Sequence, residues 1–312
     1  MLKLLVRVAL LLGAVGLLAG LGIGLGLRRS YVDAFYARFT APAAGSLVLG
    51  TSRASQGIKP GVLAARLGGR YAGPWLNYAF TLAESPYGPG YLGSIQRKLA
   101  PGTRHGLFVL AVDPWSLALP KAVLAKQPLV FPEANSRVSQ LRDVSQNPNL
   151  DYLAHYLHKP FYQLLLDTDS ARVIERLHPD GWLEIALPPP STDPALLRRR
   201  TAEKLATYRP LAASSRLAAA RLLSLWETVE FLKKHGQVVL VRLPTGPAMA
   251  ALEQDFQPNF DQLMRQLSER QGVSYLTYLG QPYPTNDGNH LHRDAAEAFS
   301  QRLAADIGRL GK

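Results

Sequence analysis

Short apolar runs alternate with amphipathic stretches along this chain from Ser46 onward. The runs are bounded by glycine, proline or polar residues, as strands are, and the stretches between them repeat apolar positions at helical spacing. This alternation is typical of βα units that build a mostly parallel sheet, so we predict an α/β fold. The predicted strands are Ser46–Leu49, Trp75–Phe80, Gly106–Val112, Gln237–Leu243 and Val273–Tyr278, and the predicted helices are Pro60–Leu67, Tyr87–Leu99, Ser215–Lys234, Asn259–Gln271 and Asp294–Leu310.

The alternation stops between Trp115 and about Ser214. This segment holds prolines, polar loops and short helical pieces, including the run Leu187-Pro188-Pro189-Pro190-Ser191. A hundred residues without a clean βα unit, inside an otherwise regular pattern, predict a central helical and loop insertion at about 115–214. Insertions of this kind often cover or flank a functional site.

A separate apolar segment precedes the α/β pattern. Val8 to Leu27 are twenty residues without a charge, closed by Arg28 and Arg29, and a helix of that length spans about 30 Å, the thickness of a bilayer core. The alternative is a cleavable signal peptide with its cleavage region at 41–44, but its apolar core should be shorter. We therefore expect residues 1–29 to be an uncleaved membrane anchor and residues 45–312 to form the folded domain. Basic residues flank both ends of the span, so they do not decide its orientation.

Charge and cysteine content narrow the function classes. The 312 residues carry a net charge of +12. They include no cysteine, and this excludes disulfides and thiolate-bound metals. The basic residues are scattered and form no recognised nucleic-acid motif; the densest run, 198–200, is interpreted as a solvated helix face. We predict no nucleic-acid partner. His155 and His158 have helical spacing, but Asp151 is the one evident carboxylate near them, so we expect neither a metal nor a cofactor.

Two short motifs, far apart in the chain, together hold the parts of a nucleophilic acyl-transfer site. Gly50-Thr51-Ser52-Arg53 directly follows the first strand, and Asp287-Gly288-Asn289-His290 lies between the last strand and the last helix. The ends of parallel strands share one edge of a sheet, so both motifs should meet there. Asp287 can then orient the imidazole of His290, which can take the proton of Ser52.

With these motifs the chain resembles the SGNH (GDSL-like) hydrolase superfamily, in its divergent membrane-anchored envelope branch. That branch is similar to the D-alanyl-transfer protein of teichoic acid synthesis and to the alginate O-acetylation proteins. The resemblance covers about residues 45–113 and 215–310. It implies a three-layer, flavodoxin-like sheet, with Ser52 as nucleophile, His290 as base and Asp287 as its orienter. It also implies a domain outside the cytoplasm.

The chain departs from that family where an oxyanion would be bound. The first block reads Gly-Thr-Ser where family members commonly have Gly-Asp-Ser, and no Gly-x-Asn-Asp block follows the third strand. Asp113 stands at that place, and a carboxylate cannot donate unless it is protonated. Asn77 and Arg53 are the substitute donor candidates, and with Asp113 they are the residues that we expect to contact an oxyanion or substrate. Each motif also has a plain structural reading, since Ser52 could cap the next helix and Asp287 could form a turn.

From these residues we predict a serine esterase or O-acyltransferase that acts on acyl esters, with acetyl the expected group, of a cell-envelope glycan or acylated polymer. The alternative is a catalytically inactive envelope protein that keeps the fold as a glycan-binding or scaffolding module. The predicted partners are the lipid bilayer, the envelope polymer and a membrane-bound acyltransferase.

Overall fold

The computed structural model describes residues 1–28, 35–126, 128–156, 174–186 and 193–310. Three of the sequence features named above, Arg29, His158 and the proline run at 187–191, lie outside the described residues.

Five parallel strands form the central sheet, in the order β2-β1-β3-β8-β9. Counted among themselves, these strands run 2-1-3-4-5, which is the flavodoxin-like doubly wound order. The predicted α/β class with a mostly parallel sheet is therefore confirmed. The strands are β1 (Ser46–Leu49), β2 (Trp75–Asn77), β3 (Gly106–Ala111), β8 (Gly236–Arg242) and β9 (Ser274–Thr277).

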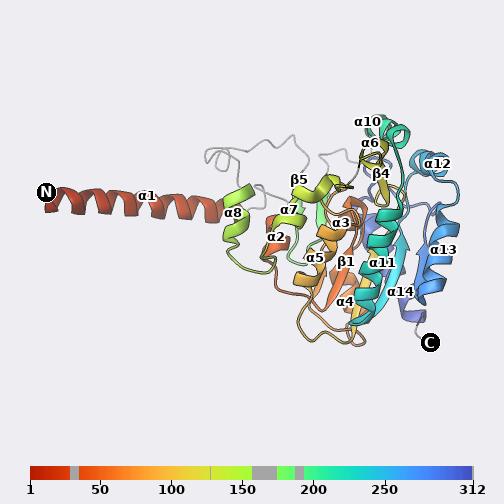
Figure 1. Cartoon of the computed structure of the whole chain (residues 1–312), viewed down its shortest axis with the longest axis horizontal. Helices are drawn as coiled ribbons and strands as arrows, with labels where there is room; N and C mark the ends of the chain where they lie inside the picture. Colours follow the sequence, from red (N-terminus) through yellow and green to blue (C-terminus); the bar gives the residue numbers. More distant parts are fainter. Residues whose placement is uncertain (29–34, 127, 157–173, 187–192, 311–312) are drawn as a thin grey trace.

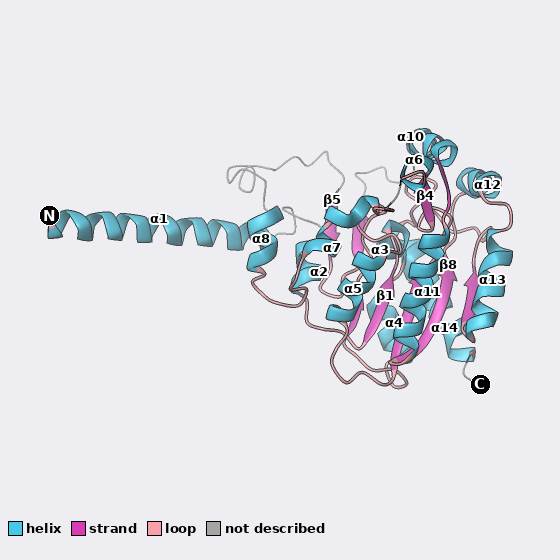
Figure 2. Cartoon of the chain, viewed as in Figure 1, coloured by secondary structure: helices cyan, strands magenta, loops and turns pink. Residues whose placement is uncertain are grey.

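Helices cover both faces of this sheet, which gives three layers (Figure 2). Successive side chains of a strand point to opposite faces. Leu47 and Leu49 accordingly pack into one apolar cluster and Val48 into the other. The first cluster packs against α2 (Tyr36–Thr40), α5 (Pro89–Lys98), α11 (Ala219–Lys233) and α13 (Phe260–Gln271), and the second against α3 (Ser52–Gly57), α4 (Pro60–Leu67) and α14 (Arg293–Arg309).

The segment between β3 and α11 adds no strand to the central sheet in its described part. Its two ends are held together, because β4 (Ala118–Pro120) pairs antiparallel with β7 (Ser215–Leu217). A hairpin in the middle of the segment docks back on the sheet, where the Asp180 carbonyl accepts from the Asn77 N–H at 2.8 Å. Its elements are β4, α6 (Lys121–Leu124), η1 (Pro132–Asn135), α7 (Arg137–Gln140), α8 (Leu150–Tyr156), β5 (Ile174–Leu177), β6 (Leu183–Ala186), α10 (Pro194–Ser214) and β7.

Several elements differ from the sequence prediction, and three of these differences lie near the carboxyl edge of the sheet or in the insertion. The second strand ends at Asn77 and not at Phe80, because the Asn77 side chain turns back to accept from the Ala79 N–H. The helix predicted from Ser215 begins at Ala219, because Ser215–Leu217 forms the strand β7. A helix that we did not predict, α12 (Pro247–Phe256), follows β8 and packs beside α10.

The N-terminal helix α1 (Leu2–Arg28) projects from the α/β body (Figure 1). Its segment Leu2–Gly22 has a mean hydropathy of 2.4, and none of its apolar window is buried against the rest of the protein. Length and composition therefore allow this helix to cross a membrane.

Candidate active site

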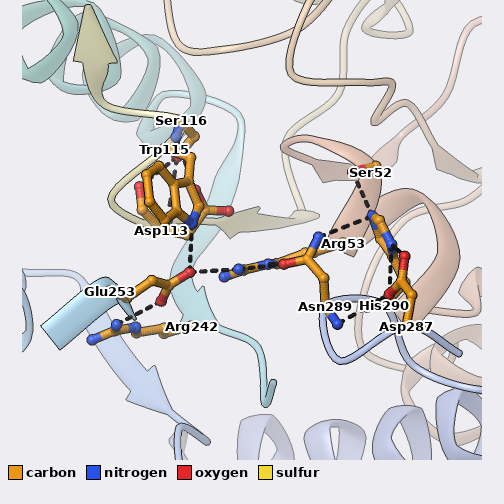
Figure 3. Close-up of polar contacts among 10 residues, drawn as sticks. All are labelled: Ser52, Arg53, Asp113, Trp115, Ser116, Arg242, Glu253, Asp287, Asn289 and His290. Atoms are coloured by element: carbon orange, nitrogen blue, oxygen red, sulfur yellow. Dashed lines mark hydrogen bonds and ion pairs between the residues drawn. The ribbon is translucent and has the colours of Figure 1, made fainter. Parts of the chain in front are cut away.

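Three side chains from opposite ends of the chain meet at the carboxyl edge of the sheet. Ser52 is the first residue of α3, directly after β1, whereas Asp287 and His290 lie in the loop between β9 and α14. Ser52 Oγ lies 2.8 Å from His290 Nε2, and His290 Nδ1 lies 2.9 Å from Asp287 Oδ2 (Figure 3). With Nδ1 donating to the carboxylate, Nε2 is left as the acceptor for the serine hydroxyl. The three groups stand in the order that a serine nucleophile, its base and an orienting carboxylate require.

The turn that carries Ser52 depends on Gly50. Gly50 has φ of +134°, and a Cβ there would lie 2.8 Å from the Cβ of Ala111 on the neighbouring strand. Its N–H donates to the Tyr91 hydroxyl at 3.1 Å, and its carbonyl accepts from Ser85 Oγ at 2.7 Å. The turn is therefore held rigidly on both sides. The side chain of Ser52 does not cap α3, because Thr51 is the N-cap residue and Ser52 Oγ contacts His290 instead.

The loop that carries His290 is shaped by the carboxylate of Asp287. Its Oδ1 accepts the backbone N–H groups of Asn289, at 3.0 Å, and His290, at 2.9 Å. Gly288, between Asp287 and Asn289, has φ of +75°, and its carbonyl accepts from Gly246 N at 2.8 Å, which ties this loop to the start of α12. Asp287 thus forms the turn and also contacts the imidazole of His290. The turn role and the orienting role that the sequence suggested for it are therefore compatible.

Electrostatics keep Asp287 ionised. Burial acts to raise the pKa of its carboxyl, but the hydrogen bonds and charge of His290, together with Lys204, lower the pKa below its ordinary value. Lys204 Nζ lies 3.1 Å from Asp287 Oδ2 and comes from α10 of the insertion. The insertion therefore contributes a charge directly to this constellation.

Behind His290, on the interior side, lies a buried network of charges (Figure 3). Arg53 donates from Nε to Asn289 Oδ1 at 3.0 Å and from Nη2 to both Asn289 Oδ1 and Glu253 Oε1. Glu253 also accepts from Arg242 at 2.8 Å and from the indole N–H of Trp115 at 2.7 Å. Burial acts to raise the pKa of Glu253, but the two guanidinium groups overcome it and lower the pKa below its ordinary value. The network holds Arg53 and Asn289 in fixed positions.

The three residues that we expected to contact an oxyanion or substrate have other partners. Both hydrogens of the Asn77 amide are donated to backbone carbonyls, those of Ala54 and Ile58, each at 2.8 Å. Asp113 Oδ1 accepts from Ser116 N at 2.8 Å and closes the turn after β3. Asn77 and Asp113 thus make positioning contacts, and so does Arg53 through Nε and Nη2, whereas its Nη1 is buried without a hydrogen-bond partner among the described residues. Burial raises the pKa of Asp113, and Arg53 opposes that rise.

On its outer side, His290 opens into a cleft of about 520 Å³ between α10 and the β5–β6 hairpin. Asp287 and His290 line it, together with Ile185 and a set of charged and amide side chains. The wall residues include Gln56, Glu175, Arg199, Arg200, Glu203 and Thr207. Part of the basic run at 198–200, which we had interpreted as a solvated face, therefore borders the candidate site.

The sequence prediction missed Lys204, Glu253 and Asn289. Glu253 lies on α12, which begins at Pro247 directly after Gly246 and places apolar residues at helical spacing. Glycine and proline at these positions are a helix-start signal, so α12 could have been predicted from the sequence. Asn289 lies inside the motif that we did identify. Its position between Asp287 and His290 is the signal by which it could have been found.

The described residues contain no group of three histidine, aspartate or glutamate side chains placed to hold a metal ion. His155 is exposed on α8, and its Nδ1 lies 2.8 Å from the Asp151 carbonyl. It shares no contact with the Ser52–His290 pair.

Comparison with known proteins adds little to this geometry. No family model matches the chain, and no curated protein matches it. Among solved structures the chain is similar to a carbohydrate acetylesterase from Sinorhizobium meliloti, with 12% sequence identity and a TM-score of 0.39, over 85% of this chain and 99% of that chain. At this identity and TM-score the likeness says nothing about activity or substrate. The fold and site together define a doubly wound α/β protein with a serine, histidine and aspartate in hydrogen-bonded series.

Proposed function

We propose that this protein is a serine acyl-ester hydrolase or O-acyltransferase. The observation that carries the proposal is the continuous series of hydrogen bonds from Asp287 through His290 to Ser52, which opens into a cleft. A serine that merely capped a helix would not share a hydrogen bond with an imidazole that a carboxylate orients. This series is what activates a serine for attack on an ester.

The reaction follows from the positions of the atoms. Ser52 Oγ attacks the ester carbonyl carbon while His290 Nε2 takes the hydroxyl proton, and Asp287 stabilises the resulting imidazolium. The tetrahedral intermediate expels the alcohol, which receives that proton from His290, and leaves an acyl group on Ser52. Water or an acceptor hydroxyl then attacks the acyl-enzyme, with His290 again acting as base. Hydrolysis and transfer differ in this second acceptor alone.

The lining of the cleft supports a hydroxyl-rich substrate. Its walls carry charged and amide side chains from α10 and the β5–β6 hairpin, which can hydrogen-bond to sugar hydroxyls. We therefore propose an acylated glycan of the cell envelope as substrate, with acetyl as the acyl group. Small acyl groups need little apolar surface around the serine.

The N-terminal helix supports a place at a membrane. We propose that α1 anchors the chain as a single span, with the α/β domain outside the cytoplasm and within reach of a membrane-bound acyltransferase. Cysteine substitutions at exposed positions of the domain, followed by labelling of intact cells with a thiol reagent that does not cross membranes, test the orientation. Labelling that requires cell lysis contradicts it.

Turnover of 4-nitrophenyl acetate by the full-length chain in detergent tests the activity. We expect Ser52→Ala to abolish turnover while its melting temperature stays close to that of the wild type. Equal rates for the two proteins contradict the proposal and favour the alternative of a glycan-binding or scaffolding module.

A further inference from the structure

The proposed chemistry needs a hydrogen-bond donor for the oxyanion. Of the three expected side chains, Asn77 and Asp113 do not supply one, and Arg53 keeps one buried nitrogen, Nη1, that no hydrogen bond uses within the described residues. Both amide hydrogens of Asn77 go to the carbonyls of Ala54 and Ile58, and Asp113 accepts from Ser116. Donors aimed at the developing negative charge are usually a large part of catalysis by such a site. Asn289, which Arg53 contacts, is a polar side chain whose NH₂ group lies beside the Ser52–His290 pair.

Asn289 is buried, with 1% of its surface exposed, and its amide has a determined orientation. The guanidinium of Arg53 donates to one atom of this amide from both Nε and Nη2. A guanidinium has donors only, so the atom that it contacts must be the oxygen and the opposite atom must be the NH₂ group. Arg53 thus turns the two N–H donors of Asn289 away from itself.

The NH₂ group of Asn289 faces the reacting pair. Its Nδ2 lies 3.2 Å from His290 Nε2, the same nitrogen that lies 2.8 Å from Ser52 Oγ (Figure 3). In the resting site Asn289 and Ser52 both point donors at one lone pair. When Nε2 takes the serine proton, that lone pair disappears and the N–H aimed at it loses its acceptor, while the amide keeps its side-chain hydrogen bond with Tyr208. The oxyanion appears beside it at the same moment, one bond beyond the carbon that Ser52 has attacked.

We propose that Asn289 Nδ2 donates a hydrogen bond to the oxyanion of the tetrahedral intermediate, in place of the missing side-chain donor after β3. The inference rests on the proposed acyl-transfer function and adds a catalytic residue to it. Arg53 is the positioning residue, because it holds Asn289 Oδ1 and is itself held by Glu253. The donor is used in the transition state more than in the ground state, which is what accelerates a reaction.

Two substitutions of Asn289 test whether the site uses its NH₂ group as a donor or only its oxygen as an acceptor for Arg53. Asn289→Ala removes the oxygen that Arg53 contacts together with the NH₂ group. Asn289→Asp keeps an oxygen for Arg53, removes the NH₂ donor and adds a negative charge. We expect both full-length variants to lose about 10²–10³-fold in kcat for 4-nitrophenyl acetate, the usual cost of one oxyanion donor, with KM changed less than about threefold. Because a carboxylate beside the imidazole also shifts the pH profile, rates are compared on the high-pH plateau.

Binding of phenylboronic acid supplies a readout that a structural role would not move. It adds to the serine as a tetrahedral anion that resembles the intermediate, so its inhibition constant should rise by about the same 10²–10³-fold in both variants. Asn259→Ala, at an exposed asparagine that begins α13, is the matched control and should leave both constants unchanged.

The outcomes distinguish the two claims. An active wild type with an Asn289→Asp variant of nearly wild-type kcat and boronate affinity overturns the donor role and leaves the proposed function standing. A wild type that neither turns over the ester nor binds the boronate overturns the proposed function, and the role of Asn289 falls with it. A loss confined to Asn289→Ala means that the oxygen, and not the NH₂ group, is what the site uses, and it also overturns the donor role.

Discussion

The two sides of His290 are built in opposite ways. On the interior side, Arg53, Glu253 and Arg242 form a chain of ion pairs in which every member is at most 4% exposed. On the outer side, Arg199 and Glu203 face each other at 3.6 Å with about two thirds or more of each side chain exposed. Buried pairs are geometrically demanding and hold their members in place, whereas exposed pairs contribute little to stability. The interior side therefore suits positioning, and the outer side suits recognition of a substrate.

The largest expected effect is at His290, where the interior side and the outer side meet. We expect His290→Ala to reduce kcat/KM for 4-nitrophenyl acetate by about 10⁶-fold, because loss of a nucleophile or its base removes the benefit of the whole triad. The melting temperature, measured in the same detergent, should change by a few degrees. A loss of less than about tenfold means that Ser52 does not depend on His290.

The contrast in stability between the two sides is testable with one substitution on each. Glu253→Gln removes the charge shared by Arg53 and Arg242 and leaves both guanidinium groups buried, so it should cost about 3–5 kcal/mol of unfolding free energy. Glu203→Gln, the matched change on α10, should cost less than about 1 kcal/mol. Urea unfolding followed by tryptophan fluorescence measures both. Similar costs for the two substitutions would remove the distinction between the sides.

The pH dependence of stability isolates Asp287. Its folded pKa lies below the ordinary value of about 3.9, so its contribution is fully present above that pH and is lost as the pH falls toward the folded pKa. Asp287→Asn should therefore cost about 1.5–3 kcal/mol at pH 7, the range for hydrogen bonds to a charged group, and less below about pH 4. Urea unfolding of both proteins at pH 7 and pH 3 measures the difference. A cost that is equal at the two pH values means that the charge of Asp287 does not stabilise the fold.

The smallest expected effect concerns the outer wall. Arg200→Ala should raise KM for an acylated glycan by about twofold to tenfold and leave kcat unchanged, because Arg200 lines the cleft but lies outside the Ser52–His290 series. Steady-state kinetics with an acetylated oligosaccharide measures both constants. A fall in kcat with unchanged KM would place Arg200 with the chemistry and not with recognition.

The sequence was most informative where local patterns decide the structure. Strand β1 is a buried apolar run that ends in glycine, and Ser52 follows it directly, so its place at the sheet edge could be predicted. The same holds for the loop of Asp287 and His290, which lies between a strand and a helix. These positions follow from the order of elements in a parallel sheet.

Contacts between distant segments could not be predicted from these local patterns. Lys204 reaches Asp287 because α10 packs on Trp115 and α12, and nothing in its helical stretch indicates which face turns toward the loop. Glu253 pairs with Arg53 across 200 residues of chain. Asn77 has the right chemistry for an oxyanion donor, but its hydrogens are taken by the turn of α3. A sequence reveals which groups are present, whereas their partners depend on the packing of distant elements.

The central claim is that Ser52 is a nucleophile activated by His290. Fluorophosphonate labelling of the full-length chain in detergent, read by intact mass, tests it most directly. The account predicts one adduct on the wild type, located at Ser52, with no adduct on Ser52→Ala and little on His290→Ala. A well-folded wild type that takes no label, or one that is labelled equally after Ser52→Ala, would contradict it.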